Sequence, residues 1–368
     1  MNDQSLKLTA YFGERQLALG SKRFLADAML DLFGDRGVAT SVMMRGTTGF
    51  GPSHQLRCDR SLSLSEDPPA VIAAVDVESK IRALVDDATA MTCQGLLTLE
   101  RARLVTRHNA SDALSTIDNG IEDAAKLTVY TGRQARIGGV PAERAVCEIV
   151  RAHGFDGTTA FLGVDGTAYG ERFRARFFGR NVNVPLMIIA VGSAPRVSAA
   201  AAELTTLLRN PLLTVERVRL CKRDGVLLGR PHRLPATDGQ GRNLWQKLMV
   251  HTDEAAHFDG VPIHRVLVHR LMQSEAARGA TALRGIWGFR GDRKPHGDKL
   301  FQIARGVPVT TIIVDTPEAI ARSFDIVDEL TTRHGLVTSE MVPAAMAFTE
   351  FQDGRQGTSE TPLAQYNY

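Results

Sequence analysis

The sequence predicts an α+β fold built from three tandem βαββαβ units, and two observations lead to this prediction. First, similar segments (KLTAYFGE, KLTVYTGR and KLMVHTDE) recur with a period of about 120 residues, beginning at Lys7, Lys126 and Lys247. Second, two further landmarks recur in step with them: a proline-led apolar run (from Pro69, Pro185 and Pro308) and a Thr-x-Glu motif (from Thr98, Thr214 and Thr338). Chance does not keep three landmarks in register over three copies, so the chain is an internal repeat.

Each copy is predicted to form the order strand, helix, strand, strand, helix, strand. The lysine-led segment is the first strand, and apolar residues at helical spacing follow it (in the first copy Leu25, Ala28, Met29, Leu32 and Phe33). The proline-led runs VIAAV, LMIIAV and TTIIV are too continuous for a half-exposed strand, so they indicate central strands. A second helix with a predicted N-cap (Asp76, Ser193 or Thr316) and a final strand complete each copy.

This order is that of the split βαβ, or ferredoxin-like, unit, which places both helices on one face of a four-stranded sheet. The other face is bare, and three units in one chain can cover those faces against each other around a common axis. In the last strand the apolar side changes near Glu100, which indicates a strand that leaves its own sheet to meet the neighbouring unit. Arg101 and Arg103 follow, echoed by Arg217 and Arg219, and are predicted to form interface ion pairs, with ligand contact as the alternative. Pro343 predicts an edge position for the last strand of the third unit.

The predicted domains are residues 1–105, 125–221 and 244–348, joined by linkers at 106–124 and 222–243. The C-terminal stretch 349–368 is polar and lacks an apolar period, so it is predicted to be a flexible tail.

Composition narrows the function classes. A formal charge of +3, with 43% hydrophobic and 23% charged residues, is ordinary for a globular protein and predicts no nucleic-acid partner. The four cysteines form no CxxC pair, so neither a zinc site nor a redox dithiol is expected. No stretch approaches the ~20 apolar residues of a membrane span, and the N-terminus lacks a signal-peptide pattern, so we expect a cytoplasmic protein.

Two glycine-rich stretches are the candidate ligand-binding elements. RGTTGFG begins at Arg45 and RGIWGFRG at Arg284, between the second and third strands of their units. Backbone amides freed by glycine, together with the arginine, could hold an anion. The alternative is a purely conformational role for the glycines. The candidate residues are Arg45, Gly46, Gly49, Phe50, Gly51, Arg284, Gly285, Gly288, Phe289, Arg290 and Gly291.

The corresponding stretch of the second unit, LGVDGTAYGER from Leu162, lacks the arginine and carries Asp165, so we expect unequal ligand occupancy among the units. The glycine spacing is neither the dinucleotide fingerprint nor a P-loop. Among histidines and carboxylates, His54, His296, Glu66, Asp67 and Glu254 have no partner at catalytic or metal-ligand spacing. We therefore expect no enzyme activity, no metal and no cofactor.

The order KLTxYxGE, RGxxGFG, the proline-led strand ending in VD, and GLxTLE resembles the bacterial family called domain of unknown function 190, which is similar to the PII-like signalling proteins. The resemblance spans nearly the whole chain, once per unit. It implies ferredoxin-like units in a trimer with small ligands, often adenine nucleotides such as ATP, ADP or AMP, in the clefts between units.

By this resemblance the chain is a PII-like pseudo-trimer, a monomer with three joined units, that regulates a protein partner through the mobile loops 46–66 and 285–306. A membrane transporter is an expected partner, because genes of the family often neighbour fluoride exporters. Two alternatives stay open: a ligand-free trimeric interaction scaffold, and an enzyme acting on a phosphorylated small molecule.

Overall fold

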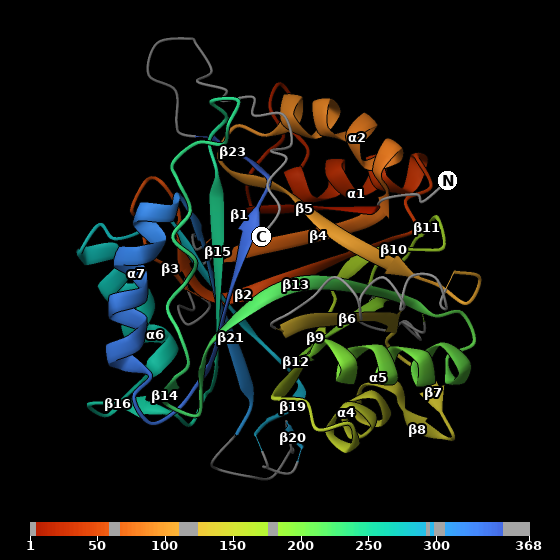
Figure 1. Cartoon of the computed structure of the whole chain (residues 1–368). Helices are drawn as coiled ribbons and strands as arrows, with labels where there is room; N and C mark the ends of the chain where they lie inside the picture. The colour runs from red at the N-terminus through yellow and green to blue at the C-terminus, as the bar shows by residue number, and fades with distance from the viewer. Residues whose placement is uncertain are drawn as a thin grey trace.

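The computed structural model describes residues 5–58, 67–109, 124–175, 183–291, 295–297 and 306–348, and the chain has an α+β fold (Figure 1). Each repeat contributes two described helices on the outside of the molecule. They are α1 (Leu25–Asp35) and α2 (Glu78–Met91), α4 (Ala142–Ala152) and α5 (Ala194–Leu207), and α6 (Ile263–Gln273) and α7 (Pro317–Leu330). The helices predicted from apolar spacing are therefore confirmed. No described helix has the length and apolar character needed to cross a membrane.

The three repeats use one strand order. The first repeat has β1 (Ser5–Gly13), β2 (Thr40–Phe50), β4 (Pro69–Val77) and β5 (Gly95–Val105), paired antiparallel in the order β5-β1-β4-β2. The second has β6 (Ala124–Gly132), β9 (Gly157–Leu162), β12 (Pro185–Ser193) and β13 (Leu212–Arg223), in the order β13-β6-β12-β9. The third has β15 (Trp245–Asp253), β18 (Ala280–Arg284), β21 (Pro308–Asp315) and β22 (Leu336–Val342), in the order β22-β15-β21-β18. The proline-led strand thus lies inside each sheet, as its apolar run predicts.

Shorter strands extend these sheets or form small hairpins. They are β3 (Arg57–Cys58), β7 (Arg136–Ile137), β8 (Val140–Pro141), β10 (Asp165–Ala168), β11 (Glu171–Arg172), β14 (Val226–Leu227), β16 (His257–Phe258), β17 (Val261–Pro262), β19 (Trp287–Arg290), β20 (His296–Gly297) and β23 (Ala344–Phe348). The predicted linker 222–243 therefore contains the end of β13 and all of β14. The predicted flexible tail 349–368 lies outside the described residues.

The predicted N-caps differ in what they do. The Thr316 side chain accepts a hydrogen bond from the Ala319 amide, as predicted. Ser193 occupies the N-cap position of α5 without a side-chain capping bond. The prediction for Asp76 is wrong by one residue, because Val77 is the N-cap of α2. The Asp76 carboxylate instead accepts hydrogen bonds from the amides of Val77 and Ala39, which tie the start of the helix to the segment before β2.

Apolar side chains fill two kinds of core. On the outer face of each sheet the two helices of that repeat cover a separate cluster, with Met29, Val146 and Phe324 among the fully buried members. On the inner faces one shared cluster draws on all three repeats: Val42, Met44, Val71, Val75, Tyr130, Phe161, Met187, Ile189, Leu212, Trp245, Met249, Leu283, Ile312, Val314, Val342 and Ala345. The sheet faces left bare by the helices therefore cover each other, which supplies the burial that a single sheet lacks.

The second strand of each repeat crosses to the next repeat in a cyclic pattern. β2 pairs with β18, β19 with β9, and β10 with β2, so the first repeat meets the third, the third meets the second and the second meets the first. The register is the same at each crossing: Gly49 lies opposite Thr281, Gly288 opposite Thr159, and Gly166 opposite Val42.

The last strands make a second cycle of contacts. β5 pairs with β1 through Ala102 and with β13 from Arg103 onward, which confirms that this strand leaves its own sheet beyond Glu100. β13 in turn pairs with β22, and β23 pairs with β5, which closes the cycle. Nine strands (β1, β5, β13, β22, β15, β21, β18, β2 and β4) close into a barrel through these pairings. The edge position predicted from Pro343 is wrong, because the last strand of the third repeat, β22, pairs with β15 on one side and with β13 on the other. Pro343 itself lies between β22 and β23.

Candidate functional site: a cleft between the first and third repeats

A cavity of about 720 Å³ lies between the first and third repeats. We call it the 1/3 cleft. Its walls come from the end of β1, the turn after β2 and the start of β5 on one side, and from β15, β18, β21 and β23 on the other. The cleft exists because β2 pairs with β18 on one side of it while β23 pairs with β5 on the other.

Aromatic side chains and two unpaired polar atoms form part of the wall. Phe50, Trp245 and Phe348 line the cleft, and Trp245 is 6% exposed. The indole Nε1 of Trp245 has no hydrogen-bond partner among the described residues, and neither does the buried Oε1 of Gln16. The other amide atom of Gln16, Nε2, donates to the Gln94 carbonyl at 2.9 Å. Buried polar atoms without partners cost free energy. Both atoms are covered in the empty cleft, so a bound molecule gains these hydrogen bonds only if the Trp245 or Gln16 side chain turns to expose them.

Two arginines give the 1/3 cleft its positive groups. Arg278 is held by Asp315, with Nη2 and Nε at 2.7 and 2.9 Å from Oδ1, and its guanidinium lies 4.7 Å from the Trp245 ring centroid. Arg57 forms an ion pair with Asp67, whose carboxylate also accepts the Arg15 amide. Asp67, which the sequence left as a solvated loop charge, therefore has a defined partner. Carboxylates behind the guanidinium groups fix their orientation, so a planar or anionic ligand would meet cations already in place.

Of the predicted ligand-binding residues, Phe50 and Gly51 line the 1/3 cleft. Arg45 does not line it: this side chain is 61% exposed, and its Nε lies 2.5 Å from the Glu14 carboxylate. Arg284 likewise pairs with Glu254, with Nη2 3.2 Å from the carboxylate oxygen Oε2. The third-repeat stretch therefore repeats the local geometry of the first, but each arginine is engaged by a carboxylate that follows the first strand of its own repeat.

The predicted glycines serve close strand crossings. A Cβ on Gly49 would lie 2.6 Å from the Ala280 carbonyl oxygen, and one on Gly288 would lie 2.2 Å from that of Thr158. Gly46 and Gly285 are equally restricted, with a carbonyl oxygen of the adjacent repeat 3.1 Å away. These four glycines lie in or beside strands and none has a left-handed φ. Their small size lets neighbouring repeats pair, which supports the conformational alternative.

The predicted loops 46–66 and 285–306 are only partly loops. Residues 46–50 belong to β2 and residues 287–290 to β19, whereas residues 59–66 and 298–305 lie outside the described part of the chain. Phe289 is buried in the core of the second repeat, and Arg290 is 5% exposed in an ion pair with Asp253. Gly291 has a φ of +53°, and its amide donates to the Asp156 carbonyl at 2.9 Å. This group of predicted residues therefore belongs to the boundary between the third and second repeats.

A ring of six buried charges joins the three repeats, and we call it the Lys–Glu ring. Each first strand supplies a lysine that is the cross-strand partner of a glutamate on the last strand of the same repeat. Each lysine also pairs with the glutamate of another repeat, so that the six side chains close a cycle. In order around the cycle they are Lys7, Glu216, Lys126, Glu340, Lys247 and Glu100.

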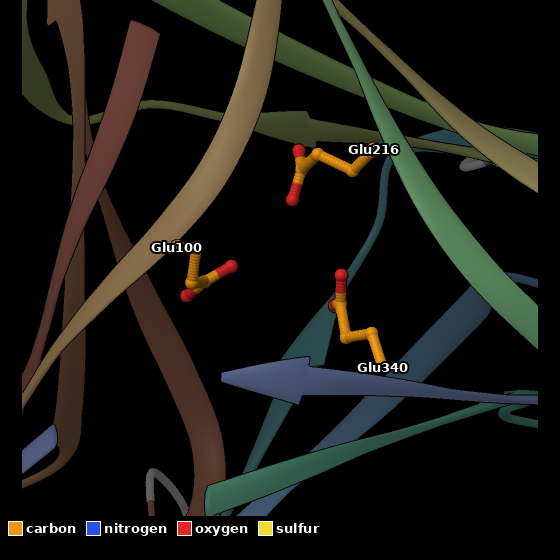
Figure 2. Close-up of side chains that lie close together, drawn as sticks. All are labelled: Glu100, Glu216 and Glu340. Atoms are coloured by element: carbon orange, nitrogen blue, oxygen red, sulfur yellow. The ribbon is translucent and has the colours of Figure 1, made fainter. Parts of the chain in front are cut away.

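The three carboxylates of the Lys–Glu ring point toward one another between strands of the three repeats (Figure 2). Lys7 lies 2.5 Å from Glu216 and 2.8 Å from Glu100, and all six side chains are buried. Carboxylate oxygens within 4.8 Å of one another have the spacing of a cation site. Here, however, three ammonium groups already balance the three carboxylates, so the ring is neutral without a metal ion.

Burial and pairing oppose each other in this ring. Burial by itself would raise the pKa of Glu100, but the ammonium groups of Lys247 and Lys7 hold it well below its usual range. Burial likewise acts to lower the pKa of Lys7, and Glu100 and Glu216 raise it well above its usual value. Lys126 differs, because burial outweighs its two carboxylates and its pKa is lowered. The shifts of pKa at Lys7, Glu100, Glu216 and Lys247 therefore favour their charged forms, and each of these shifts depends on the other ring members.

The sequence comparisons agree with the threefold organisation. The profile of the family DUF190, described as "Uncharacterized ACR", matches residues 5–104, 124–220 and 245–344. The chain belongs to the DUF190 family. A similar protein is the "UPF0166 protein" of Aquifex aeolicus (strain VF5), which is 33% identical over 96 residues. The match covers 26% of this chain and 88% of that protein, so this relative corresponds to about one DUF190 repeat.

Sequence reasoning missed both the Lys–Glu ring and most of the 1/3 cleft. The ring had a signal, because a lysine and a glutamate recur at fixed positions in all three DUF190 repeats, inside strands that are otherwise apolar. The sequence carries no such recurring signal for the cleft residues Gln16, Trp245 and Arg278. The corresponding positions of the other DUF190 repeats hold different residues, and the walls of the cleft come from segments far apart in the chain.

Proposed function

We propose that this chain is a PII-like regulatory protein, a pseudo-trimer of ferredoxin-like units that binds an adenine nucleotide in the 1/3 cleft. The observation that carries the proposal is the cavity between repeats, with two oriented arginines, an aromatic wall, and an unpaired donor and acceptor. The cyclic strand pairings and the shared inner core support the pseudo-trimer. A volume of about 720 Å³ is within the ~300–1,000 Å³ typical of small-molecule sites.

Each part of a nucleotide has a matching feature in the cleft. A base can stack on the aromatic wall, and a turn of the Gln16 or Trp245 side chain would bring the unpaired Oε1 or Nε1 within hydrogen-bond reach of it. Its phosphates can bind the guanidinium groups of Arg57 and Arg278. The titratable groups of the described lining are these two arginines, the Cys93 thiol and Tyr11, whose pKa is raised by burial. We therefore propose binding without turnover.

The signal would leave the cleft through the segment after β2. Gly51, Pro52, Ser53 and Arg57 line the cleft and belong to the connection between β2 and β4. A ligand that contacts them changes the free energy of the conformations open to this connection, and a protein partner that reads one conformation then becomes ligand-dependent. A membrane transporter remains the partner expected from the family resemblance.

Isothermal titration with ATP, ADP, AMP and cyclic nucleotides tests the proposal. We expect saturable binding of at least one of them. Arg278→Gln should weaken it by roughly tenfold or more, because a charge-assisted hydrogen bond contributes about 1.5–3 kcal/mol. Trp245→Phe should weaken it by a smaller factor, because this change removes only the indole donor from an aromatic wall.

Arg322→Gln is the matched control, since the exposed pair of Arg322 with Glu318 on α7 lies outside the cleft lining. Thermal unfolding of each variant checks that the fold is intact. The absence of both heat and thermal shift with every nucleotide would contradict the proposal and favour the ligand-free scaffold. A scaffold would bind its protein partner equally well with and without nucleotide.

A further inference from the structure

The three boundaries between repeats differ at equivalent positions of the same strands. In the first repeat Gly13 lies opposite Pro69, and in the third Asp253 lies opposite Pro308, so these two positions correspond by sheet register. The residue that follows the aromatic position of the second strand is Gly51 in the first repeat and Arg290 in the third. The 1/3 cleft thus has two glycines where the boundary between the third and second repeats has an aspartate and an arginine. We call this equivalent boundary, defined by the β19–β9 pairing, the 3/2 cleft.

In the 3/2 cleft these two side chains bind each other. Arg290 Nη2 pairs with Asp253 Oδ2, and both residues are nine-tenths buried or more. Arg290 lies opposite Gly157 of the second repeat in the β19–β9 pairing, so the ion pair sits at the boundary between the repeats. In the 1/3 cleft, by contrast, a Cβ on Gly51 would have no heavy atom within 4 Å. The Gly51 position is therefore open in the 1/3 cleft. The Arg57–Asp67 pair lies against Gly13 there and is 20% and 29% exposed, whereas the Arg290–Asp253 pair is buried.

The charge at a further position is also reversed. Arg278 of the third repeat aligns in sequence with Asp156 of the second repeat. Arg278 lies two residues before β18, and Asp156 lies one residue before β9. Asp156 is 8% exposed and pairs with Arg223 at 2.8 Å. The counterpart of Trp245 is Ala124. The 3/2 cleft therefore replaces a cation and an aromatic ring of the 1/3 cleft with a carboxylate and a methyl group.

We propose that the Arg290–Asp253 ion pair closes the 3/2 cleft from within, so that the chain binds one anionic ligand, in the 1/3 cleft. This inference rests on the proposed function. The Asp253 carboxylate takes the place of the ligand's anionic group on Arg290. The Asp156 carboxylate, paired with Arg223, stands where the 1/3 cleft offers a second guanidinium. The boundary between the second and first repeats has Gly132, Ala168 and Ser5 at the corresponding positions, which are small and uncharged.

Calorimetric stoichiometry with ADP as the probe tests the inference. We expect one ADP per unmodified chain. Asp253→Gly gives the third repeat the glycine of the other two and frees Arg290, so a second ADP per chain should bind. Asp259→Gly is the matched control: it removes an exposed carboxylate of the same repeat at a left-handed φ of +49°, which glycine tolerates, and it should leave the stoichiometry at one.

Tryptophan emission locates the site without relying on the stability of the aspartate variant. The chain has two tryptophans: Trp245 lines the 1/3 cleft, and Trp287 lies in β19, three residues before Arg290. We expect Trp287→Phe to retain both the single ADP and the emission change that ADP causes. Loss of that emission change would overturn the inference.

The remaining outcomes separate the inference from the function on which it rests. Two or three ADP molecules per unmodified chain would overturn the inference and leave the proposed function intact. A stoichiometry that stays at one in folded Asp253→Gly would overturn the role of the ion pair. A chain that binds none of ATP, ADP, AMP and the cyclic nucleotides would overturn the proposed function and the inference with it, and if one of the others binds in place of ADP, the same stoichiometries are measured with that nucleotide.

Discussion

Replacing Lys247 with methionine tests how the three repeats are held in register. Lys247 is a member of the Lys–Glu ring with a side chain 4% exposed, and it pairs with Glu340 at 2.6 Å and with Glu100. Burial acts to lower the pKa of Lys247, but the two carboxylates raise it well above its usual value. The charged lysine therefore gains more from its partners than it loses by desolvation. Its removal leaves two buried carboxylates each with one ammonium partner in place of two.

The expected loss of stability follows from this geometry. Two unit charges 2.6 Å apart attract each other by about 6 kcal/mol at an effective dielectric constant of about 20. Part of this gross attraction only offsets the desolvation of the lysine, which methionine does not require. Removing one partner of a buried pair costs about 3–5 kcal/mol in net terms, and we expect Lys247→Met to lower the free energy of unfolding by that amount. Lys126→Met should cost less, because burial already lowers the pKa of Lys126.

Urea denaturation followed by circular dichroism measures these losses. The double variant Lys247→Met/Glu340→Gln restores a neutral ring and should recover at least ~1 kcal/mol of the single-variant loss. Lys80→Met is the matched control, because the Lys80 side chain is 38% exposed in its pair with Asp76 and should contribute about 0–1 kcal/mol. If Lys247→Met lowers the free energy of unfolding by no more than Lys80→Met does, the Lys–Glu ring does not hold the three repeats together.

Four further outcomes follow. The ring glutamates with lowered pKa stabilise the fold above pH 4.5, their pKa in the unfolded chain, so the free energy of unfolding should decline as the pH falls below 4.5. The ring lysines with raised pKa stabilise the fold below pH 10.5, so the free energy of unfolding should also decline as the pH rises beyond 10.5. Gly288→Val should lower the melting temperature, because its Cβ meets a carbonyl oxygen of the adjacent repeat, whereas Gly239→Val, with open space around it, should not. Thr316→Ala should cost about 1 kcal/mol in urea denaturation through loss of a helix cap. In the native protein a thiol reagent should modify the half-buried Cys93 but not the buried Cys147, whose pKa is raised to about 12, and mass spectrometry identifies the modified residue.

The predictions that succeeded depend on local patterns in the chain. Apolar spacing placed the six described helices, and the unbroken proline-led runs identified the central strands. The change of apolar side near Glu100 indicated a strand that leaves its sheet, and β5 pairs with β13 from Arg103 onward. Each of these signals arises because a short segment meets one environment on each of its faces.

The residues predicted to bind a ligand have partners that the sequence does not show, in their own repeat or in another. Arg45 and Arg284 were candidates for ligand contact, but each is paired with a carboxylate that follows the first strand of its own repeat. Gly49 was a candidate for an anion cradle, but it makes room for the Ala280 carbonyl, more than 200 positions along the chain. A glycine that lets two backbones approach and a glycine that frees an amide have the same letter, and only the position of the second backbone distinguishes them.

The amino-acid sequence by itself determined that this protein consists of three like units and that the strand and helix order of each unit leaves one sheet face uncovered. Periodicity alone encodes both facts, because the burial of a helix or strand repeats with its own pitch. The tertiary structure decided which faces meet, which charges close into the Lys–Glu ring, and which cleft stays open. Those features depend on side chains brought together from different repeats, where attraction and desolvation act over a few ångströms of space, whatever the distance along the chain.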